Sequence, residues 1–230
     1  MSLVGKNRKV FSYTNADVRD KFFQHKDFNK AQPYHSNFSQ GRFENSSFSA
    51  TKFKFCGMHG CSFESCDFTG SLFRNCNLQN SKFSNCIIRA SIFEKCKLQG
   101  VEFNNCIIVG QKIPVNYDLN ISNIFLASNP SVSDFDPDLI KVVEELRSNS
   151  FIRKSAVFHL KRQKTNTVTL RFLLLSFSSD FLIENIPVLA EEIRRDFYTV
   201  RESPNKPSVM RESPQHLIRA AHEPDELFRL

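Results

Sequence analysis

Thiols are the groups in this sequence with the greatest capacity for chemistry. Seven cysteines occur among the 230 residues, and every interval between them is a multiple of five. They are Cys56, Cys61, Cys66, Cys76, Cys86, Cys96 and Cys106. Structural zinc prefers thiolates paired two to four residues apart, and no such pair is present. The odd number, and the absence of cysteine elsewhere, argue against a disulfide framework and favour reduced thiols in the cytoplasm. We therefore expect small buried residues, with no metal and no cofactor.

Other catalytic groups form no recognisable set. The sequence has no Gly-x-Ser-x-Gly motif and no phosphate-binding glycine loop, and its six histidines are scattered. A cysteine–histidine nucleophile could use His59, but the regular spacing of the thiols favours a core role. Five acidic residues could suggest a metal-dependent nuclease: Asp134, Asp136, Asp138, Glu144 and Glu145. Helix capping and a solvated helix face explain them better, so we predict that the protein is not an enzyme.

The element that positions the thiols is a repeat of five residues. Every fifth position from Phe38 to Ile113 is apolar. These sixteen positions are Phe38, Phe43, Phe48, Phe53, Met58, Phe63, Phe68, Phe73, Leu78, Phe83, Ile88, Phe93, Leu98, Phe103, Ile108 and Ile113. Two residues before each of them stands mostly Ser, Cys or Thr. A period of five fits neither a helix nor a flat strand, and a fixed short period of this kind is typical of a solenoid.

The repeat resembles the pentapeptide-repeat family, with units such as CDFTG at 66–70, SLFRN at 71–75 and CNLQN at 76–80. The resemblance covers residues about 35–113. It implies a mainly β fold, a right-handed four-sided β-helix with four pentapeptides per coil and about four coils. It implies no single activity, because members of the family do different things. Some bind type II topoisomerases, are thought to imitate DNA and protect against quinolones.

Four pentapeptides per coil place residues twenty apart in a stack. Two opposite faces then carry Phe43, Phe63, Phe83 and Phe103, and Phe53, Phe73, Phe93 and Ile113. The other two carry Phe38, Met58, Leu78 and Leu98, and Phe48, Phe68, Ile88 and Ile108. Most of the thiols accompany these last two faces, so large walls alternate with smaller ones, as close packing requires. Adjacent coils should lie about 4.8 Å apart.

The segments that precede and follow the repeat in the sequence should differ in structure. Residues 1–34 continue the frame weakly, and we expect either a cap or a degenerate first coil there, with a break at Pro33. Pro114 should end the repeat. Residues 114–230 are expected to form a mostly helical C-terminal module.

Several helices are expected in that module. One should begin at Asp136-Pro137, because Asp caps a helix and Pro suits its first position. Residues 165–171 could be a strand or a loop before a helix, since short apolar runs do not distinguish the two. Residues 180–198 indicate a helix with a kink or break at Pro187. A last helix is expected over 214–221.

The net charge of +7 comes from residues 1–113. Imitation of DNA requires dense negative charge, so a positive rod disfavours it. Direct contact with nucleic acid is the alternative function, and its candidate residues are Lys52, Lys54, Arg74, Arg153, Lys154, Lys161 and Arg162. No apolar run approaches 18 residues, so we expect no membrane span. The basic start lacks a following hydrophobic segment, which argues against a secretory signal.

A cluster of outward aliphatic residues is the main candidate site. Leu72 and Ile92 should stack on one face, and Ile87, Ile107 and Val109 on the neighbouring face. An apolar patch of this kind usually marks a docking site. It could be covered by the C-terminal half, by a second copy of the chain or by another protein. The sequence therefore predicts a non-catalytic scaffold or adaptor for protein–protein interaction.

Overall fold

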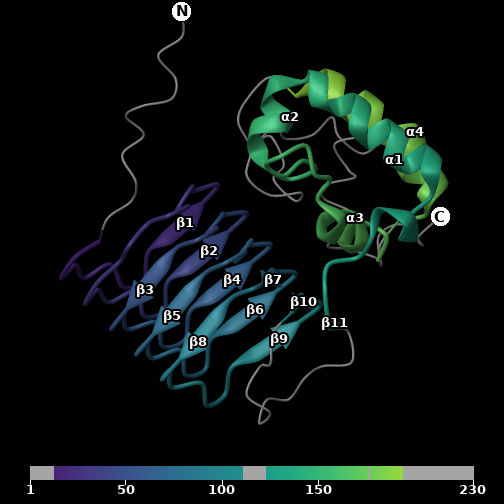
Figure 1. The fold of residues 1–230 in the computed structure, drawn as a ribbon. Coiled ribbons are helices and arrows are strands. Elements are labelled where there is room, and N and C mark those ends of the chain that lie inside the picture. The colour runs from purple at the N-terminus through teal and green to yellow at the C-terminus, as the bar shows by residue number, and fades with distance from the viewer. Residues whose placement is uncertain (1–12, 111–122, 176, 194–230) are drawn as a thin grey trace, which may run out of the picture. The chain divides into compact units, whose positions relative to one another are not determined.

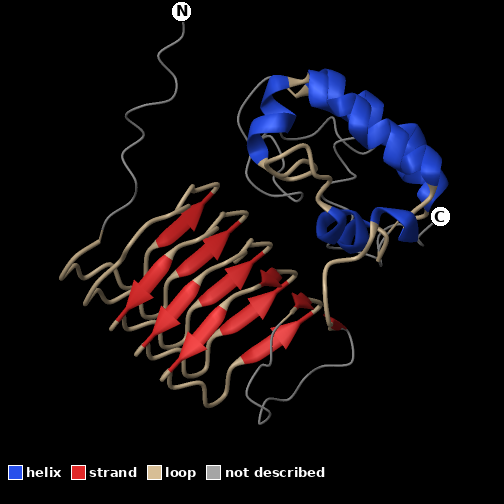
Figure 2. Cartoon of the chain, in the orientation of Figure 1, coloured by secondary structure: helices blue, strands red, loops and turns tan. Residues whose placement is uncertain are grey.

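The computed structural model describes residues 13–110, 123–175 and 177–193. The chain forms two compact units, residues 1–125 and residues 126–230. Strands build the first unit and helices the second, as Figures 1 and 2 show. Each unit is described by itself below.

The first unit is a solenoid of three-residue strands. They are β1 (Phe22–Gln24), β2 (Arg42–Glu44), β3 (Lys52–Lys54), β4 (Ser62–Glu64), β5 (Leu72–Arg74), β6 (Lys82–Ser84), β7 (Ile87–Arg89), β8 (Ile92–Glu94), β9 (Glu102–Asn104), β10 (Ile107–Val109) and β11 (Ile124–Leu126). They form three sheets in the orders β1-β2-β4-β6-β9, β3-β5-β8 and β11-β10-β7. Parallel bridges from Asp17 through Asn37, Gly57 and Asn77 to Lys97 make a fourth face. The rod is therefore four-sided, as predicted.

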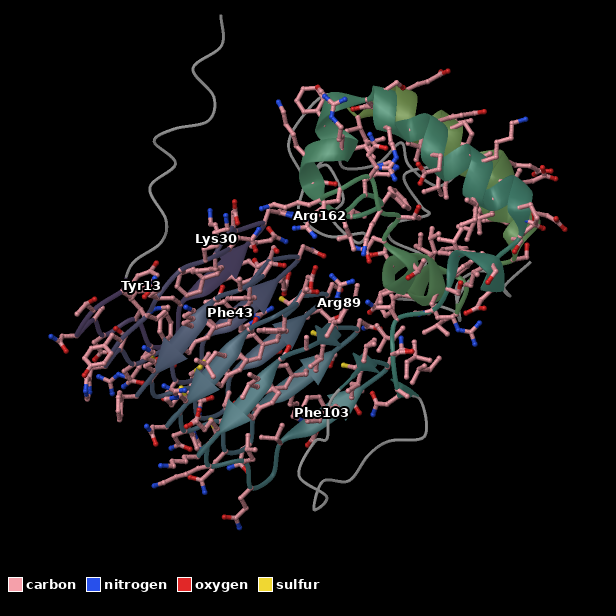
Figure 3. All side chains as sticks on the ribbon, viewed as in Figure 1. Tyr13, Lys30, Phe43, Arg89, Phe103 and Arg162 are labelled. Carbon is pink, nitrogen blue, oxygen red and sulfur yellow. The ribbon has the colours of Figure 1, made fainter. Side chains whose placement is uncertain are left out.

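Residues twenty apart pair in register, which confirms the predicted stacking. Phe43 lies opposite Phe63, and Phe53 opposite Phe73, in parallel pairs. Their rings stack with centroids 5.0 Å apart in both pairs, close to the spacing of neighbouring strands. Figure 3 shows Phe43 and Phe103 among the coils. The Phe side chains thus form continuous columns through the core.

Each corner of the rod is a residue in the left-handed conformation, two positions after the central apolar residue. This position has a positive φ all along the rod, for example 53° at Asn75 and 68° at Gly70. Asn and Gly tolerate this conformation at little cost, whereas bulky residues resist it. One such residue in every five redirects the chain, so that the next pentapeptide forms the next side of the square cross-section. The five-residue period is therefore a period of corners as well as of core residues.

Where the residue two positions before a core residue is Ser, Thr or Cys, its side chain donates to a backbone carbonyl, as two examples show. The Ser71 hydroxyl donates to the Phe48 carbonyl at 2.7 Å, and the Cys61 thiol donates to the Phe38 carbonyl at 3.1 Å. Both of these acceptors belong to the preceding coil, whereas the Ser46 hydroxyl donates to the Glu44 carbonyl of its own coil. A buried polar group needs such a partner, so Ser, Thr and Cys can all occupy this position. The sequence predicted that the thiols are small core residues, and six of the seven are buried, but it did not predict these hydrogen bonds.

Residues 13–34 form a further coil before the repeat. Thr14 bridges to Tyr34, and Phe23 pairs with Phe43. The expected break at Pro33 is wrong, because Pro33 is buried and its carbonyl accepts from the Lys54 amide at 3.0 Å. Proline lacks the backbone N–H donor but retains its carbonyl oxygen, so Pro33 can still accept a hydrogen bond from the next coil.

Beyond the repeat, β11 adds a strand that the sequence did not predict. The Asn123 side chain donates to the Phe103 carbonyl at 2.6 Å and accepts from the Cys106 amide at 2.8 Å. Cys106 makes the same pair of bonds one coil earlier. The Ile124 amide then donates to the Cys106 carbonyl at 2.9 Å. Asn123 stands 17 residues after Cys106, outside the five-residue frame, and this shift hides the strand from a periodic reading.

Between residues 126 and 193, the described part of the second unit contains short helices and a hairpin. Its helices are η1 (Val132–Asp134), α1 (Pro137–Glu145), η2 (Leu146–Ser148), α2 (Ser150–Ser155), α3 (Thr167–Leu173) and α4 (Ser179–Glu192). α1 and α4 pack against each other. Leu139 and Val143 of α1 and Leu182 and Ile186 of α4 are buried. An apolar stripe on each helix thus supplies the core of this unit.

The helix expected to begin at Asp136-Pro137 is confirmed, and the helix expected from residue 180 is present as α4. Asp136 caps α1, since its side chain accepts from the Asp138 amide at 2.8 Å. At 165–171, neither expected form is correct, because Thr165 makes only one antiparallel bridge with His159 and α3 already begins at Thr167. α4 continues through Pro187. α2 was not predicted, and residues 194–198 and 214–221 lie outside the described residues.

The thiols should differ in reactivity according to their burial. Burial raises the pKa of Cys61 to about 12 and raises the pKa of Cys86 and Cys106, so these groups hold little thiolate at neutral pH. Cys96 is only half-buried, and a hydrogen bond from Cys76 lowers its pKa. We expect Cys96 to react first with a thiol reagent, and Cys61, Cys86 and Cys106 only after denaturant is added. Mass spectrometry of the labelled peptides measures this order. Uniformly rapid labelling in native buffer would contradict the buried ladder.

His159 is a buried titratable group in the second unit. It is 2% exposed, and its Nε2 bonds to the Val143 carbonyl at 2.8 Å. Its Nδ1 is buried without a hydrogen-bond partner. Burial is the main cause of a lowered pKa for this imidazole, because a charged ring would lose its hydration.

This unit should therefore lose stability in mild acid. The unfolded chain takes up a proton at His159 near pH 6.5, whereas the folded chain resists it until a lower pH. The free energy of unfolding is thus complete above about pH 6.5 and declines as pH falls below it. The helical circular dichroism signal in urea, followed between pH 7.5 and about 5.5, measures the decline. The His159→Gln variant keeps an amide donor and should flatten this dependence. An unchanged slope in that variant would assign the effect to other groups.

Candidate interaction surface

The β3–β5–β8 face of the rod carries the candidate surface. Phe53 and Phe73, at the centres of β3 and β5, are buried, so the residues on either side of them point outward. Two outward columns result from the parallel register. One contains Lys52, Leu72 and Ile92, and the other contains Tyr34, Lys54, Arg74 and Glu94.

Large apolar side chains are concentrated on this face and its corner. The exposed fraction is 57% for Ile92, 44% for Phe55 and 42% for Tyr34. Among the described residues of the first unit, Phe22 is the other large apolar side chain with such exposure, on the β1–β2 face. Three of these four residues therefore belong to one side of the rod. Exposure of these apolar side chains to water is unfavourable in free energy, and a bound partner could remove this cost by covering them.

Three rings form a cluster at the corner beside β3. The rings of His35 and Phe55 stack in parallel, with centroids 5.0 Å apart. Tyr34 meets both edge-on, at 4.4 Å from His35 and 5.7 Å from Phe55. Phe55 occupies a corner position with φ of 55°, where a bulky side chain is unfavourable. Backbone strain at an exposed aromatic residue suggests a role outside the fold.

The charge of this face is mainly positive. Arg74 and Glu94 form an ion pair at 2.8 Å, with side chains about half exposed. Lys52 and Lys54 have no ion-pair partner among the residues that the structure describes. Exposed ion pairs contribute little stability, so the Arg74–Glu94 pair can be rearranged by a partner. The face therefore presents apolar groups flanked by uncompensated cations.

The predicted aliphatic cluster is divided between two environments. Ile92 is exposed and Leu72 is partly exposed on the β3–β5–β8 face. On the neighbouring face, Ile87, Ile107 and Val109 are 8%, 0% and 2% exposed. The surface available to a partner is therefore limited to the first pair, together with the aromatic corner.

The aromatic corner was missed by the sequence analysis. Tyr34, His35 and Phe55 follow a central residue and do not occupy one, so the series of central apolar residues does not include them. A signal was available at Phe55, because the other corner residues of the repeat are mostly small or polar. A large apolar residue at a position that disfavours it could have been identified from the sequence.

The basic candidates of the C-terminal half lie on two elements. Arg153 and Lys154 are in the last turn of α2, and Lys161 and Arg162 are in the hairpin before α3. All four are exposed. They belong to the second unit, and Lys52, Lys54 and Arg74 belong to the first.

The described residues provide neither a metal-binding cluster nor a membrane-spanning helix. They contain no group of three or more His, Cys, Asp or Glu side chains that could hold a metal ion. Within the same residues, no helix has the length and apolar character needed to cross a membrane.

The family of the rod can now be stated. The profile of the family described as "Pentapeptide repeat region" matches residues 36–113. Together with the four-sided parallel rod, this match shows that this segment of the chain belongs to the pentapeptide-repeat family. No curated protein sequence matches the chain.

Several solved structures are similar to part of this chain at low identity. A pentapeptide repeat protein, Rfr23, from the cyanobacterium Cyanothece 51142 is 9% identical with a TM-score of 0.30, over 50% of this chain and 90% of that one. The pentapeptide repeat protein alr5209 from Nostoc PCC 7120 is 17% identical with a TM-score of 0.38, over 43% and 84%. QnrB1, a plasmid-mediated fluoroquinolone resistance protein, is 17% identical with a TM-score of 0.31, over 53% and 59%. These similarities concern the fold alone.

Proposed function

We propose that this protein is a non-catalytic scaffold or adaptor that binds another protein, or a second copy of itself, through the β3–β5–β8 face. One observation carries the proposal: three of the four large apolar side chains exposed on the described rod lie on this face and its corner. Aromatic residues are enriched at the centres of protein interfaces. A rigid rod can present them without losing conformational entropy on binding.

The chemistry of the face indicates the character of its partner. Ile92 and the Tyr34–His35–Phe55 rings offer apolar area at two places. Lys52 and Lys54 lie on β3, beside the rings, without acidic partners among the described residues. A complementary surface would combine apolar residues with carboxylates, since complementary potentials speed encounter and exclude wrong partners. We place this function in the cytoplasm, where the seven free thiols would stay reduced.

Site-specific photocrosslinking in cells tests the proposal. A photoreactive amino acid at Ile92 should give a discrete adduct, because a bound partner would cover this side chain. The same residue at Phe22 is the matched control, since Phe22 is 52% exposed on another face. An adduct of twice the chain mass would identify the partner as a second copy. Absence of any adduct at residue 92, or equal adducts at both positions, would reject this face as the docking surface.

Nucleic-acid contact through Lys52, Lys54 and Arg74 is less well supported for the rod. Arg74 is already paired with Glu94. The His35 and Phe55 rings stack on each other, which limits the ring faces available for stacking with bases. The rod therefore favours a protein partner.

A further inference from the structure

Cations and anions are segregated along the second unit. From Arg147 to Arg171 the chain has seven Lys or Arg residues and no Asp or Glu. They are Arg147, Arg153, Lys154, Lys161, Arg162, Lys164 and Arg171. α4, in contrast, has four acidic residues and no cation within Ser179–Glu192. Such a separation gives one part of the unit a strongly positive field although its overall charge is close to neutral.

The fold brings most of these cations together. The chain reverses in a hairpin, in which the Leu160 amide donates to the Lys164 carbonyl at 2.7 Å. Arg147 fixes the tip of this hairpin, because its guanidinium donates to the Gln163 carbonyl at 2.9 Å. Arg153 of α2 donates to the Arg147 carbonyl at 3.1 Å. The end of α2 and the hairpin tip are therefore joined through one residue.

Five exposed cations result, and we call them the basic hairpin surface: Arg153, Lys154, Lys161, Arg162 and Lys164. None of the five has an ion-pair partner among the described residues. Arg147 itself is engaged with Glu144 at 2.8 Å and serves as the anchor. The surface thus keeps its full positive charge.

The turn itself is unusual for its residue types. Arg162 and Gln163 both have positive φ, at 59° and 56°. Two-residue turns of this conformation prefer Asn and Gly, which tolerate it. The chain keeps two long polar side chains here in spite of the strain, and a strained exposed turn motivates a functional hypothesis. Figure 3 labels Arg162 on this turn.

We propose that the basic hairpin surface binds the phosphate backbone of nucleic acid, without dependence on sequence. The neighbouring apolar residues decide between the classes of anionic partner. Ile152, Val157 and Phe158 are buried, and no large apolar side chain in 147–171 is exposed. A bilayer-bound surface needs an apolar anchor, and the centre of a protein interface is usually apolar. A purely cationic surface suits the phosphate backbone, where release of counterions supplies the affinity.

Fluorescence anisotropy with the full-length protein and a short DNA duplex tests the proposal. Binding should weaken from about 50 mM to about 200 mM salt, and five phosphate contacts predict a log–log slope of roughly −4.5. A single strand of the same sequence is the second probe, and it distinguishes a duplex from a flexible backbone. Vesicles containing phosphatidylserine and a poly-glutamate chain are the other two probes.

Matched variants locate the effect. Arg162→Glu should weaken duplex binding about tenfold and reduce the salt slope by about 1. Arg162→Asn suits the positive φ and removes only the charge, so it should also reduce the slope while preserving the turn. Lys141→Glu is the control, because Lys141 is an exposed cation on α1, outside the basic hairpin surface. It should leave both quantities unchanged.

Three results would overturn the proposal. One is an absence of binding to either nucleic acid at about 50 mM salt and about 100 µM protein. Another is an equal effect of Lys141→Glu and Arg162→Glu. The third is binding to vesicles or poly-glutamate that is as tight as binding to nucleic acid. None of these outcomes depends on whether the β3–β5–β8 face binds a protein.

Discussion

The Phe83→Ala variant should lose about 3–5 kcal/mol of unfolding free energy. Phe83 is 0% exposed, and its ring stacks on Phe63 at 4.7 Å and on Phe103 at 5.1 Å. Phe68 meets it edge-on at 5.3 Å. Removal of the ring leaves a cavity with coils on both sides, and the in-register ladders limit how far these coils can collapse into it.

Urea unfolding followed by circular dichroism measures the loss, and Phe22→Ala is the matched control. Phe22 is 52% exposed and lies in contact with the Arg42 guanidinium, 5.2 Å from the ring centroid. Its removal should cost no more than about 1 kcal/mol, the value of an exposed cation–π contact. If both variants unfold at the same urea concentration, the Phe columns do not stabilise the rod in the way described.

The fold of the rod could be predicted because one local pattern determines it repeatedly. Each unit of five contains a core residue such as Phe83, a small donor such as Ser81 and a corner residue such as Asn85. Three requirements therefore repeat together, and sixteen repetitions leave no other register. Stacking at twenty residues follows from the square cross-section, since four units of five then complete one coil and every face receives a column of apolar residues.

The parts that could not be predicted depend on contacts without a period. The side-chain amide of Asn123 makes the two hydrogen bonds that a cysteine thiol makes in the coil before it. Asn123 does not lie at a multiple of five residues from the cysteines, so the repeat does not predict this role. The hairpin at 158–166 depends on the anchor from Arg147 to Gln163, which joins residues sixteen apart in the sequence. Composition does not reveal such pairs.

The candidate surface was also predicted only in part from the sequence. The sequence identified Leu72 and Ile92 as outward apolar residues, because the repeat assigns every position to the inside or the outside. The repeat does not determine which outward positions are exposed to solvent in the folded protein. Ile107, for example, was predicted to point outward and is buried. The aromatic corner was not predicted, because Tyr34, His35 and Phe55 lie outside the series of central apolar residues. Burial depends on the whole structure, whereas side-chain direction depends on the repeat.

Burial at one of these positions predicts the second large effect. Ile107→Lys should lower the free energy of unfolding by about 3–5 kcal/mol at neutral pH, because it places an ammonium group without a partner in a buried apolar site. Ile107 is 0% exposed and pairs in register with Ile87, which is also buried. Ile92→Lys is the matched control, since Ile92 is 57% exposed on the adjoining face. The same substitution there should change stability by no more than about 0.5 kcal/mol.

The pH dependence of the Ile107→Lys variant distinguishes a buried charge from a simple packing defect. Burial lowers the pKa of an introduced lysine, whereas the unfolded chain binds the proton up to about pH 10.4. The destabilisation should therefore be smallest above about pH 10 and increase as pH falls toward the lowered pKa. Urea unfolding of both variants at pH 7 and about pH 10 measures this difference. A loss that is the same at both pH values would indicate a steric defect, and an equal loss in Ile92→Lys would show that Ile107 is not the more buried of the two.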